Sequence, residues 1–199
     1  MLISILTFQG FNELDSFIAL GVLNRIKKTD WRVNICCPED SVISMNGVTI
    51  TAQSRLESIE ESDAVIVGSG ILTRDIVQNS EIMTMLKLDP MRQLIAAQCS
   101  GTLILAKLGL LGKIPACTDL STKPWVQEAG IEVLNQPFFA ENNIATAGGC
   151  FSSQYLAAWI IAKTEGIKAA SEALYYVAPV GEKEEYVERA MKNIEKYIS

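Results

Sequence analysis

The sequence predicts an α/β protein in which a largely parallel β-sheet lies between two layers of helices. Short apolar runs of strand length, such as residues 2–8 and 63–68, alternate along the chain with longer segments whose apolar residues recur at helical spacing. The Ala-Val-Ile-Val centre of residues 63–68 lacks polar alternation, which is typical of a strand buried on both faces of a parallel sheet. Repeated strand–helix units of this kind are joined by right-handed crossovers, which place helices on both faces of the sheet.

The first half of the chain contains three predicted strands, the helices that connect them and one hairpin. The hairpin is predicted because Asn46-Gly47 suits a type I′ turn between two short strands. We expect it to lie at the periphery of the sheet. In chain order, the predicted elements are a strand at 2–8, a helix at 14–26, a strand at 31–37, the hairpin at 42–52, a short helix at 55–61, a strand at 63–68 and a helix at 74–86.

The second half continues the alternation and ends in an amphipathic helix, which we expect to pack against the sheet through one apolar stripe. The stripe consists of Val187, Ala190, Met191, Ile194 and Ile198. Together the elements predict a single domain, residues 1–199, with a flavodoxin-like three-layer α/β/α sandwich. The remaining predicted elements are a strand at 93–98, a helix at 102–108, short strands at 116–118 and 131–134 around a helix at 122–129, a strand at 144–147, and helices at 152–164 and 168–176.

Charge and composition narrow the classes of partner. The formal net charge of −6, with no basic cluster, disfavours nucleic-acid binding. No segment has the roughly 18 consecutive apolar residues that a membrane span needs, and the chain enters its first apolar run without a basic leader. We therefore expect a cytoplasmic protein with neither a nucleic-acid nor a membrane partner.

Cysteine and histidine usage limits the available chemistry. The five cysteines are odd in number and lack CxxC spacing, which argues against a disulfide framework and against a structural zinc site. Histidine is absent, so no Cys-His or Ser-His mechanism can be built, and we predict no metal and no other cofactor. Cys117 and Cys150 fall at predicted strand ends, but we interpret both as inert core thiols. The full set is Cys36, Cys37, Cys99, Cys117 and Cys150.

Residues 97–101, Ala-Gln-Cys-Ser-Gly, have the pattern of a nucleophile elbow, a sharp strand-to-helix turn with small residues around a central nucleophile. Cys99 would lie at the carboxyl edge of the sheet, together with residues 10–15 and 68–70. A helix N-terminus favours an anion, so we expect the pKa of Cys99 to fall below the free value of about 8.5. The alternative interpretation of Cys99 is a small buried hydrophobic side chain.

Further segments share a family pattern with this elbow. Residues 10–17 (Gly-Phe-Asn-Glu-Leu-Asp-Ser-Phe) form a loop that leads into a helix, and residues 65–70 (Val-Ile-Val-Gly-Ser-Gly) form a strand followed by a turn of small residues. Residues 108–113 follow the elbow helix, and Ala-Gly-Gly occupies residues 147–149. In this order the segments resemble the ThiJ/PfpI (DJ-1/PfpI) superfamily, whose members have a class I glutamine amidotransferase-like fold. The resemblance extends over nearly the whole chain.

The resemblance implies roles at the carboxyl edge of the sheet. Cys99 matches the family's nucleophile and Asp15 matches its acidic partner, which would act as a proton shuttle in its protonated form. The backbone amides of Gly70 and Ser100 match an oxyanion hole. A plainer interpretation of Asp15 is an acidic residue in the first turn of its helix, where the helix dipole favours it. Whether Glu13 or Asp119 also assists Cys99 stays open.

Departures from the family's pattern favour one branch. Protease-like members pair the cysteine with a histidine, whereas Asp119 lies near the position where that histidine would be expected. Ser69 replaces a glycine of the turn, and Gly68 replaces a common proline. The Leu-Asp context of Asp15 is most similar to the isocyanide hydratase-like branch, whose members need no histidine.

The resemblance therefore implies a cysteine-dependent enzyme that acts on a small, uncharged, electrophilic substrate. Its activity would be most like that of an isocyanide hydratase, a lyase that adds water to give an N-substituted formamide. The alternative function is a non-enzymatic redox or ligand sensor that uses Cys99, oxidised for example to a sulfinate. A PfpI-like amidase or protease, a hydrolase, is disfavoured by the absence of histidine. The family also implies a homodimer.

Overall fold

The computed structural model describes residues 1–198 and confirms the predicted fold class. A seven-stranded sheet has the strand order β5-β2-β1-β6-β7-β9-β8. Every neighbouring pair is parallel except β8 and β9, which are antiparallel. The strands of this sheet are β1 (Leu2–Leu6), β2 (Arg32–Cys37), β5 (Ser54–Arg55), β6 (Ala64–Val67), β7 (Leu94–Gln98), β8 (Phe138–Glu141) and β9 (Ile144–Ala147).

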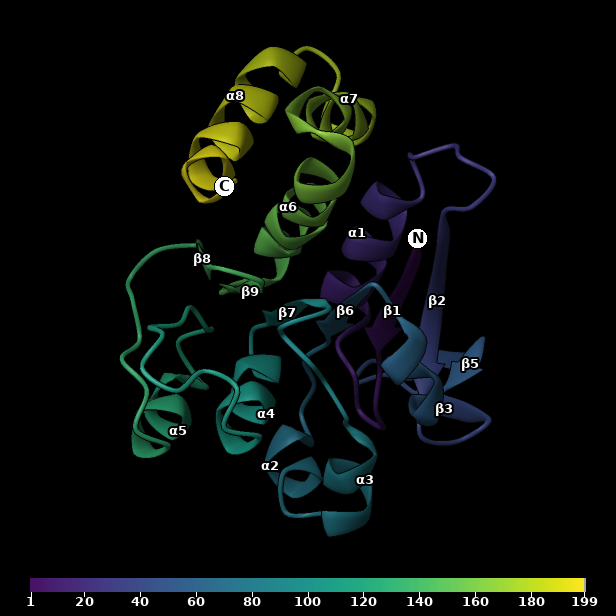
Figure 1. The fold of residues 1–199 in the computed structure, drawn as a ribbon, viewed down its shortest axis with the longest axis vertical. Helices are drawn as coiled ribbons and strands as arrows, with labels where there is room; N and C mark the ends of the chain where they lie inside the picture. The colour runs from purple at the N-terminus through teal and green to yellow at the C-terminus, as the bar shows by residue number, and fades with distance from the viewer. Residues whose placement is uncertain (199) are drawn as a thin grey trace.

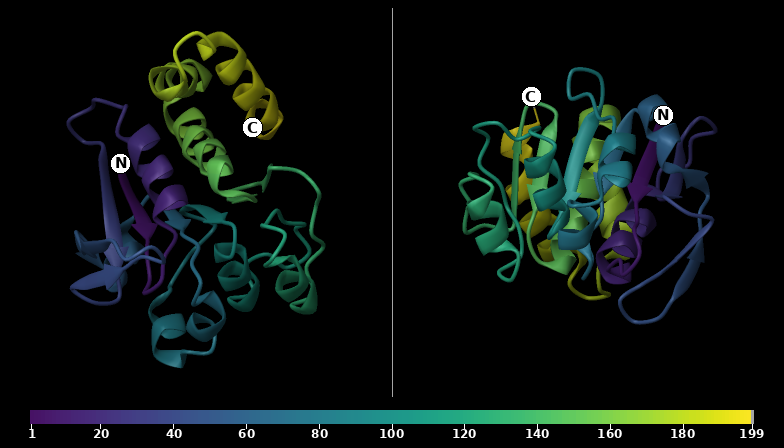
Figure 2. Two further views of the ribbon diagram at one scale, coloured as in Figure 1. Left: turned by 180° about the vertical axis from the view of Figure 1, so that it is seen from behind. Right: turned by 90° about the horizontal axis from the view of Figure 1, so that it is seen from below.

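Helices cover both faces of the sheet (Figure 1), and a view from behind shows the same two layers (Figure 2). Each layer has its own apolar core, one of which includes the fully buried Trp159 and the other the fully buried Ile104. On one face lie α1 (Glu13–Leu23), α6 (Ser153–Glu165), α7 (Ile167–Val177) and α8 (Lys183–Ile194). On the other face lie the 3-10 helix η1 (Leu56–Glu61) and helices α2 (Thr73–Ile76), α3 (Ser80–Met85), α4 (Gly101–Lys107) and α5 (Lys123–Glu128).

The closing helix α8 packs differently from the prediction. Its apolar stripe is present, since Ala190, Met191 and Ile194 are buried. However, α8 packs mainly against α6 and α7 and meets the sheet at its edge strand β8. The reason is that α6 already occupies the face of the sheet: its residues from Ser153 to Ala162 are all buried between the sheet and the outer helices.

Three predicted elements differ from the structure, one helix in the first half of the chain and two strands in the second half. The single helix expected at 74–86 is two short helices, α2 and α3, because the Asn79 side chain accepts hydrogen bonds from the Glu81 and Ile82 amides and starts a new helix. The strands expected at 116–118 and 131–134 are reduced to one isolated bridge between Ala116 and Val133. Apolar spacing alone did not reveal either interruption.

Strand β8 was not predicted from the sequence. Residues Phe138–Glu141 turn back at Asn142, which has a φ of 55°, and pair antiparallel with β9. The amide side chain of asparagine tolerates this left-handed conformation better than most residues do. The Asn-Asn sequence at 142–143 was therefore an available turn signal.

The predicted hairpin is confirmed as a separate two-stranded sheet of β3 (Ser41–Ile43) and β4 (Thr49–Thr51). Its turn contains Gly47 at a φ of 87°. A bridge between Phe11 and Ser44 attaches the hairpin to the loop that precedes α1. The hairpin therefore stands beside the carboxyl edge of the main sheet. Among residues 1–198, no helix is both long enough and apolar enough to cross a membrane.

Candidate active site at the carboxyl edge of the sheet

Cys99 occupies a strained turn between β7 and α4. Its φ is 46°, and Asn142 is the other described non-glycine residue with a positive φ. The turn is held by the Cys99 N–H, which donates to Ala147 O at 2.8 Å, and by the Thr118 hydroxyl, which donates to Cys99 O at 2.7 Å. A Cβ on Gly101 would lie 2.4 Å from Val67 O, so only glycine lets the turn pass this close to β6. The backbone has the geometry expected of a nucleophile elbow.

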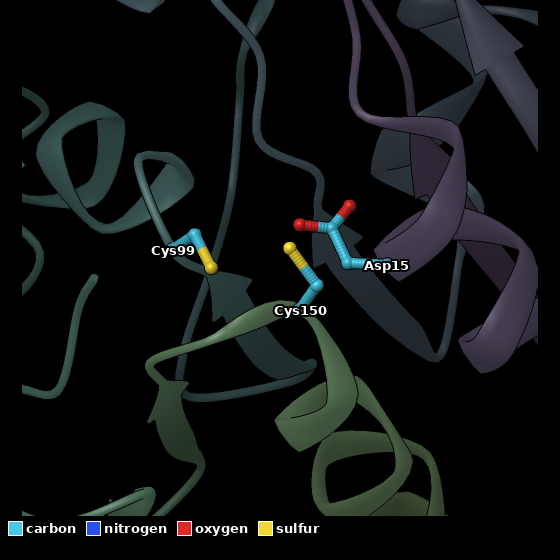
Figure 3. A group of neighbouring side chains, drawn as sticks. All are labelled: Asp15, Cys99 and Cys150. Atoms are coloured by element: carbon cyan, nitrogen blue, oxygen red, sulfur yellow. The ribbon is translucent and has the colours of Figure 1, made fainter. Parts of the chain in front are cut away.

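Three segments that are distant in the sequence meet at this turn. Figure 3 shows the Cys99 side chain facing that of Cys150, with the Asp15 carboxylate beside them. The two Sγ atoms and one Asp15 oxygen all lie within 4.8 Å of one another. Asp15 comes from the first turn of α1, and Cys150 begins the 3-10 helix η2 (Cys150–Ser152) after β9. The proximity of Asp15 was expected. The interpretation of Cys150 as an inert core thiol is wrong, because Cys150 is only half-buried and lies at the site.

The Asp15 carboxyl is 1% exposed and only half satisfied. Its Oδ2 accepts a hydrogen bond from the Ser69 hydroxyl at 2.6 Å, whereas Oδ1 has no hydrogen-bond partner. Burial raises the pKa of Asp15 to about 7, the negative charge of Asp119 adds to the rise, and the hydrogen bond from Ser69 opposes it. At neutral pH this carboxyl therefore exchanges its proton readily, as a proton shuttle must.

The expected fall in the pKa of Cys99 is wrong. Burial raises the pKa of the Cys99 thiol, and the adjacent Asp15 carboxylate raises it further. Helix α4 begins only at Gly101, and the hydrogen bond donated to Cys99 Sγ comes from the Gln98 side chain at 3.2 Å. Desolvation is the largest contribution to the pKa of Cys99. As the pH rises, Asp15 loses its proton before Cys99 does, so above a pH of about 7 the pair is mostly a thiol beside a carboxylate.

The two predicted oxyanion-hole residues, Gly70 and Ser100, lie together, but the Gly70 amide already makes a hydrogen bond within the protein. The Gly70 N–H donates to the Ser100 hydroxyl at 3.0 Å, and the Thr73 hydroxyl lies 2.7 Å from the same oxygen. A substrate would have to displace the Ser100 hydroxyl to reach the Gly70 amide. The Ser100 backbone, adjacent to Cys99, is the N-cap position of α4. The role of both amides remains a prediction.

A cavity of about 380 Å³ opens onto the cluster. Its wall combines apolar side chains such as Ile71 and Trp125 with polar groups, and none of its lining residues is Lys or Arg. The residues that line it are Asn12, Met45, Ser69, Gly70, Ile71, Cys99, Ser100, Asp119, Ser121, Thr122, Trp125, Gly149 and Cys150. The site is therefore acidic and suited to a small ligand that carries no negative charge.

Neither of the other two candidate acids contacts Cys99. Asp119 lines the cavity, but its Oδ1 accepts hydrogen bonds from the Ser121 and Thr122 amides at 2.9 and 3.0 Å. Burial works against its charged form, yet these hydrogen bonds outweigh burial and hold its pKa below the ordinary value. Glu13 faces the hairpin turn, where Asn46 and Ser44 help to hold its pKa below the ordinary value despite the opposing effect of burial.

The cluster of Asp15, Cys99 and Cys150 is also a donor set for a soft divalent ion such as Zn²⁺, with two sulfurs and one carboxylate oxygen. The sequence contains no local metal-binding motif for this set, because the three ligands come from three separate segments. The sequence did carry one signal for Cys150, namely its position just after a predicted strand and a Gly-Gly pair.

The site has a cysteine on a strained strand-to-helix turn and a buried aspartate beside it. Both lie at the edge of the parallel sheet where its strands end. The chain is therefore an α/β protein with a cysteine-centred site. A model of the DJ-1/PfpI family matches residues 1–163, and the chain belongs to this family. No curated protein matches the chain.

Solved structures of the same fold include DJ-1 from Schizosaccharomyces pombe, with a TM-score of 0.76 and 15% identity over 90% of this chain and 100% of that one. A ThiJ/PfpI family protein from Pseudomonas syringae has a TM-score of 0.78 and 17% identity over 98% of this chain and 88% of its own. Oxidised DJ-1 from Toxoplasma gondii has a TM-score of 0.76 and 18% identity over 88% of this chain and 97% of its own. Identities this low are evidence for the fold alone.

Proposed function

We propose that the chain is a cysteine-dependent hydratase of small, uncharged, electrophilic compounds, most like an isocyanide hydratase. The observation that supports this most directly is the half-satisfied, buried Asp15 carboxyl within 4.8 Å of the Cys99 sulfur. Nucleophile and proton shuttle are thus adjacent, and neither requires a histidine. A cavity without Lys or Arg supports an uncharged substrate over an anionic one.

The proposed reaction starts from a Cys99 thiol and an Asp15 carboxylate. As Sγ bonds to the terminal carbon of the isocyanide, Asp15 takes the thiol proton and passes it to that carbon, which gives a thioimidate, R–N=CH–S–Cys99. Water then adds to the same carbon while Asp15 moves one of its protons to the nitrogen. Breakage of the C–S bond releases R–NH–CHO, and the remaining hydroxyl proton returns to the sulfur. The sum is addition of one water to one isocyanide.

The backbone amides of Gly70 and Ser100 would stabilise negative charge that develops during these steps. The Gly70 N–H donates to the Ser100 hydroxyl in the resting site, so it would have to exchange this hydrogen bond for one to the substrate. The Ser100 hydroxyl would retain its hydrogen bond to Thr73. The exchange preserves the number of hydrogen bonds, so it costs little.

The test compares wild type with Cys99→Ala, Asp15→Asn and Glu13→Gln on a panel of isocyanides, 2-oxoaldehydes and small amides. Asp15→Asn keeps the shape of the side chain but removes its exchangeable proton, so kcat/KM should fall by about 10²–10⁴-fold. Cys99→Ala should abolish turnover. Glu13→Gln is the matched control, because Glu13 lies two residues from Asp15 but faces the hairpin, and it should retain wild-type activity.

Melting temperatures of all four proteins serve as the folding control. Absence of turnover by wild type on every substrate of the panel would contradict the enzyme proposal. Turnover that survives in Cys99→Ala would place the chemistry elsewhere. Faster conversion of 2-oxoaldehydes or amides than of isocyanides would keep the cysteine mechanism but reject the substrate class.

A redox sensor without turnover is the second candidate, and the second thiol next to Cys99 is the observation that favours it. Toxoplasma gondii DJ-1, a solved structure of the same fold, is an oxidised protein. An amidase or protease is less well supported, since the sequence contains no histidine to protonate a leaving amine.

We further propose that the protein is a cytoplasmic homodimer. Support for the compartment comes from the five free cysteines, which a reducing environment preserves. Support for the dimer comes from exposed apolar side chains on α1 and on the adjacent hairpin, which a second copy would cover. These side chains are Leu14, Phe17, Ile43, Met45 and Val48.

A further inference from the structure

Cys150 takes no part in the proposed hydration, yet it is held at the reacting sulfur. Its Sγ lies within 4.8 Å of Cys99 Sγ and of an Asp15 carboxylate oxygen, and Figure 3 shows the two sulfurs facing each other. Cys150 is the one cysteine among residues 1–198 that is only half-buried, and it lines the same cavity as Cys99. The Asn12 side-chain amide donates to its sulfur at 3.2 Å.

The sheet itself keeps the two cysteines near each other. Strands β7 and β9 are neighbours, and Gln98 is in register with Ala147, so both cysteines follow the carboxyl ends of adjacent strands. The Gln98 amide then bridges the two turns, because its Nε2 donates both to Cys99 Sγ at 3.2 Å and to Gly149 O at 2.9 Å. Gly149 has a φ of 87°, and this conformation turns the chain so that Cys150 returns toward the elbow.

We propose that Cys150 is a resolving thiol: a hydroperoxide that enters the cavity oxidises Cys99, and Cys150 then closes a Cys99–Cys150 disulfide that protects the nucleophile and switches the site off reversibly. The proposal goes beyond the hydratase activity and requires no turnover. The co-reactant is a small hydroperoxide such as hydrogen peroxide, and a low-molecular-weight thiol reverses the change.

Atoms and electrons balance in two steps. In the first, the Cys99 sulfur attacks one peroxide oxygen and the O–O bond breaks; the thiol loses two electrons and becomes a sulfenic acid, and water leaves. In the second, the Cys150 sulfur attacks the Cys99 sulfur, the S–O bond breaks and a second water leaves. Asp15 is near both sulfurs, so it accepts the Cys150 thiol proton and transfers it to the departing hydroxide.

The other described cysteines are unsuited to this role. Cys36, Cys37 and Cys117 have exposed fractions of 0%. The Cys36 sulfur lies 2.8 Å from the Ser54 hydroxyl, and the Cys37 sulfur lies 3.0 Å from the Thr7 hydroxyl. The disulfide is therefore expected between Cys99 and Cys150 alone.

The experiment treats the full-length protein with two equivalents of hydrogen peroxide in the presence of a chelator, followed by intact mass measurement and non-reducing peptide mapping. Wild type should lose two hydrogen atoms and two titratable thiols, and a thiol reductant should restore both. Trypsin alone leaves Cys117 and Cys150 in one peptide, residues 114–163, because Lys123 precedes Pro124. A second protease that cuts after Glu141 separates the two cysteines and identifies the bond.

Three variants make the outcome decisive. Cys150→Ser should gain two oxygen atoms at Cys99, a sulfinate that reductant does not reverse. Cys36→Ser is the matched control, since serine there keeps a hydrogen-bond partner in Ser54, and it should form the disulfide as wild type does. Asp15→Asn should form the same disulfide more slowly. Melting temperatures again report folding, and Cys150→Ala substitutes if the serine variant does not fold.

Two results would overturn the proposal. The first is a wild-type protein that accumulates the Cys99 sulfinate as fast as Cys150→Ser does, without a Cys99–Cys150 peptide. The second is a disulfide that joins Cys99 to Cys117 or links two chains. Because the readout is mass and connectivity, failure of the hydratase assay leaves the disulfide proposal standing, and failure of the disulfide leaves the hydratase proposal standing.

Discussion

Replacement of Asp15 by asparagine should stabilise the protein at alkaline pH while it lowers the proposed hydratase activity. Burial makes the charged form of Asp15 unfavourable in the folded state, so its pKa is about 7 there and about 3.8 in the unfolded chain. A raised pKa means that the folded state binds the proton more tightly. Stability from this group is therefore fully present below pH 3.8 and is lost as the pH rises to about 7, above which it stays constant.

The magnitude follows from the size of this pKa shift. A difference of about 3 pKa units, at ~1.4 kcal/mol per unit, corresponds to ~4 kcal/mol of lost stability at pH 8. Asparagine is neutral at all these pH values and can accept the Ser69 hydrogen bond, so it avoids this loss. Its amide N–H group would occupy the place of the unpartnered Oδ1, and an unsatisfied polar group offsets ~1–2 kcal/mol of the gain. The expected net gain at pH 8 is ~2–3 kcal/mol.

Urea unfolding of wild type and Asp15→Asn at pH 4 and pH 8, followed by tryptophan fluorescence, measures this difference. At pH 4 the variant should be ~1 kcal/mol less stable than wild type, because the cost of the unsatisfied amide is not yet offset there, and at pH 8 the variant should be the more stable protein. Asp119→Asn is the control of opposite sign: the pKa of Asp119 is held below its ordinary value, so its charge is stabilising and the variant should lose stability at pH 8. An Asp15→Asn protein that is no more stable than wild type at pH 8 would show that burial of Asp15 does not disfavour its charged form in the folded state.

Two further predictions concern the elbow and its thiols. Sub-stoichiometric iodoacetamide should label Cys99 and Cys150 before Cys36, Cys37 and Cys117, because only the first two line the cavity, and peptide mapping that finds a core cysteine labelled first would contradict this. Gly101→Ala places a Cβ 2.4 Å from Val67 O, so it should lower the free energy of unfolding by ~3 kcal/mol or more. Gly21→Ala is the control, because Gly21 is in helix α1 and a Cβ there has nothing within 4 Å. This substitution should raise the free energy of unfolding by up to ~1 kcal/mol. Urea unfolding measures both, and equal effects of the two substitutions would show that the close approach at the elbow is not required.

Local signals in the sequence predicted regular elements well where one residue type controls the backbone. The Asn46-Gly47 turn defined the hairpin, and the apolar run of β6 marked a central strand. The same reasoning missed the break between α2 and α3, since the apolar spacing continues across Asn79 even though the helix does not. It also missed β8, whose pairing with β9 depends on a contact that forms only in the sheet.

The α/β order, the elbow at Cys99 and the exclusion of histidine chemistry could be predicted from the sequence alone, because each depends on residue type and local spacing. The role of Asp15 as the acid was implied by the resemblance to the DJ-1/PfpI family. The tertiary structure decided which side chains share the site. It places Cys150 at the elbow and Glu13 against the hairpin. It also places Asp119 where its carboxylate accepts hydrogen bonds from the Ser121 and Thr122 amides. It also reversed the expected ionisation of Cys99, because desolvation depends on everything packed around a group, and no local pattern records that packing.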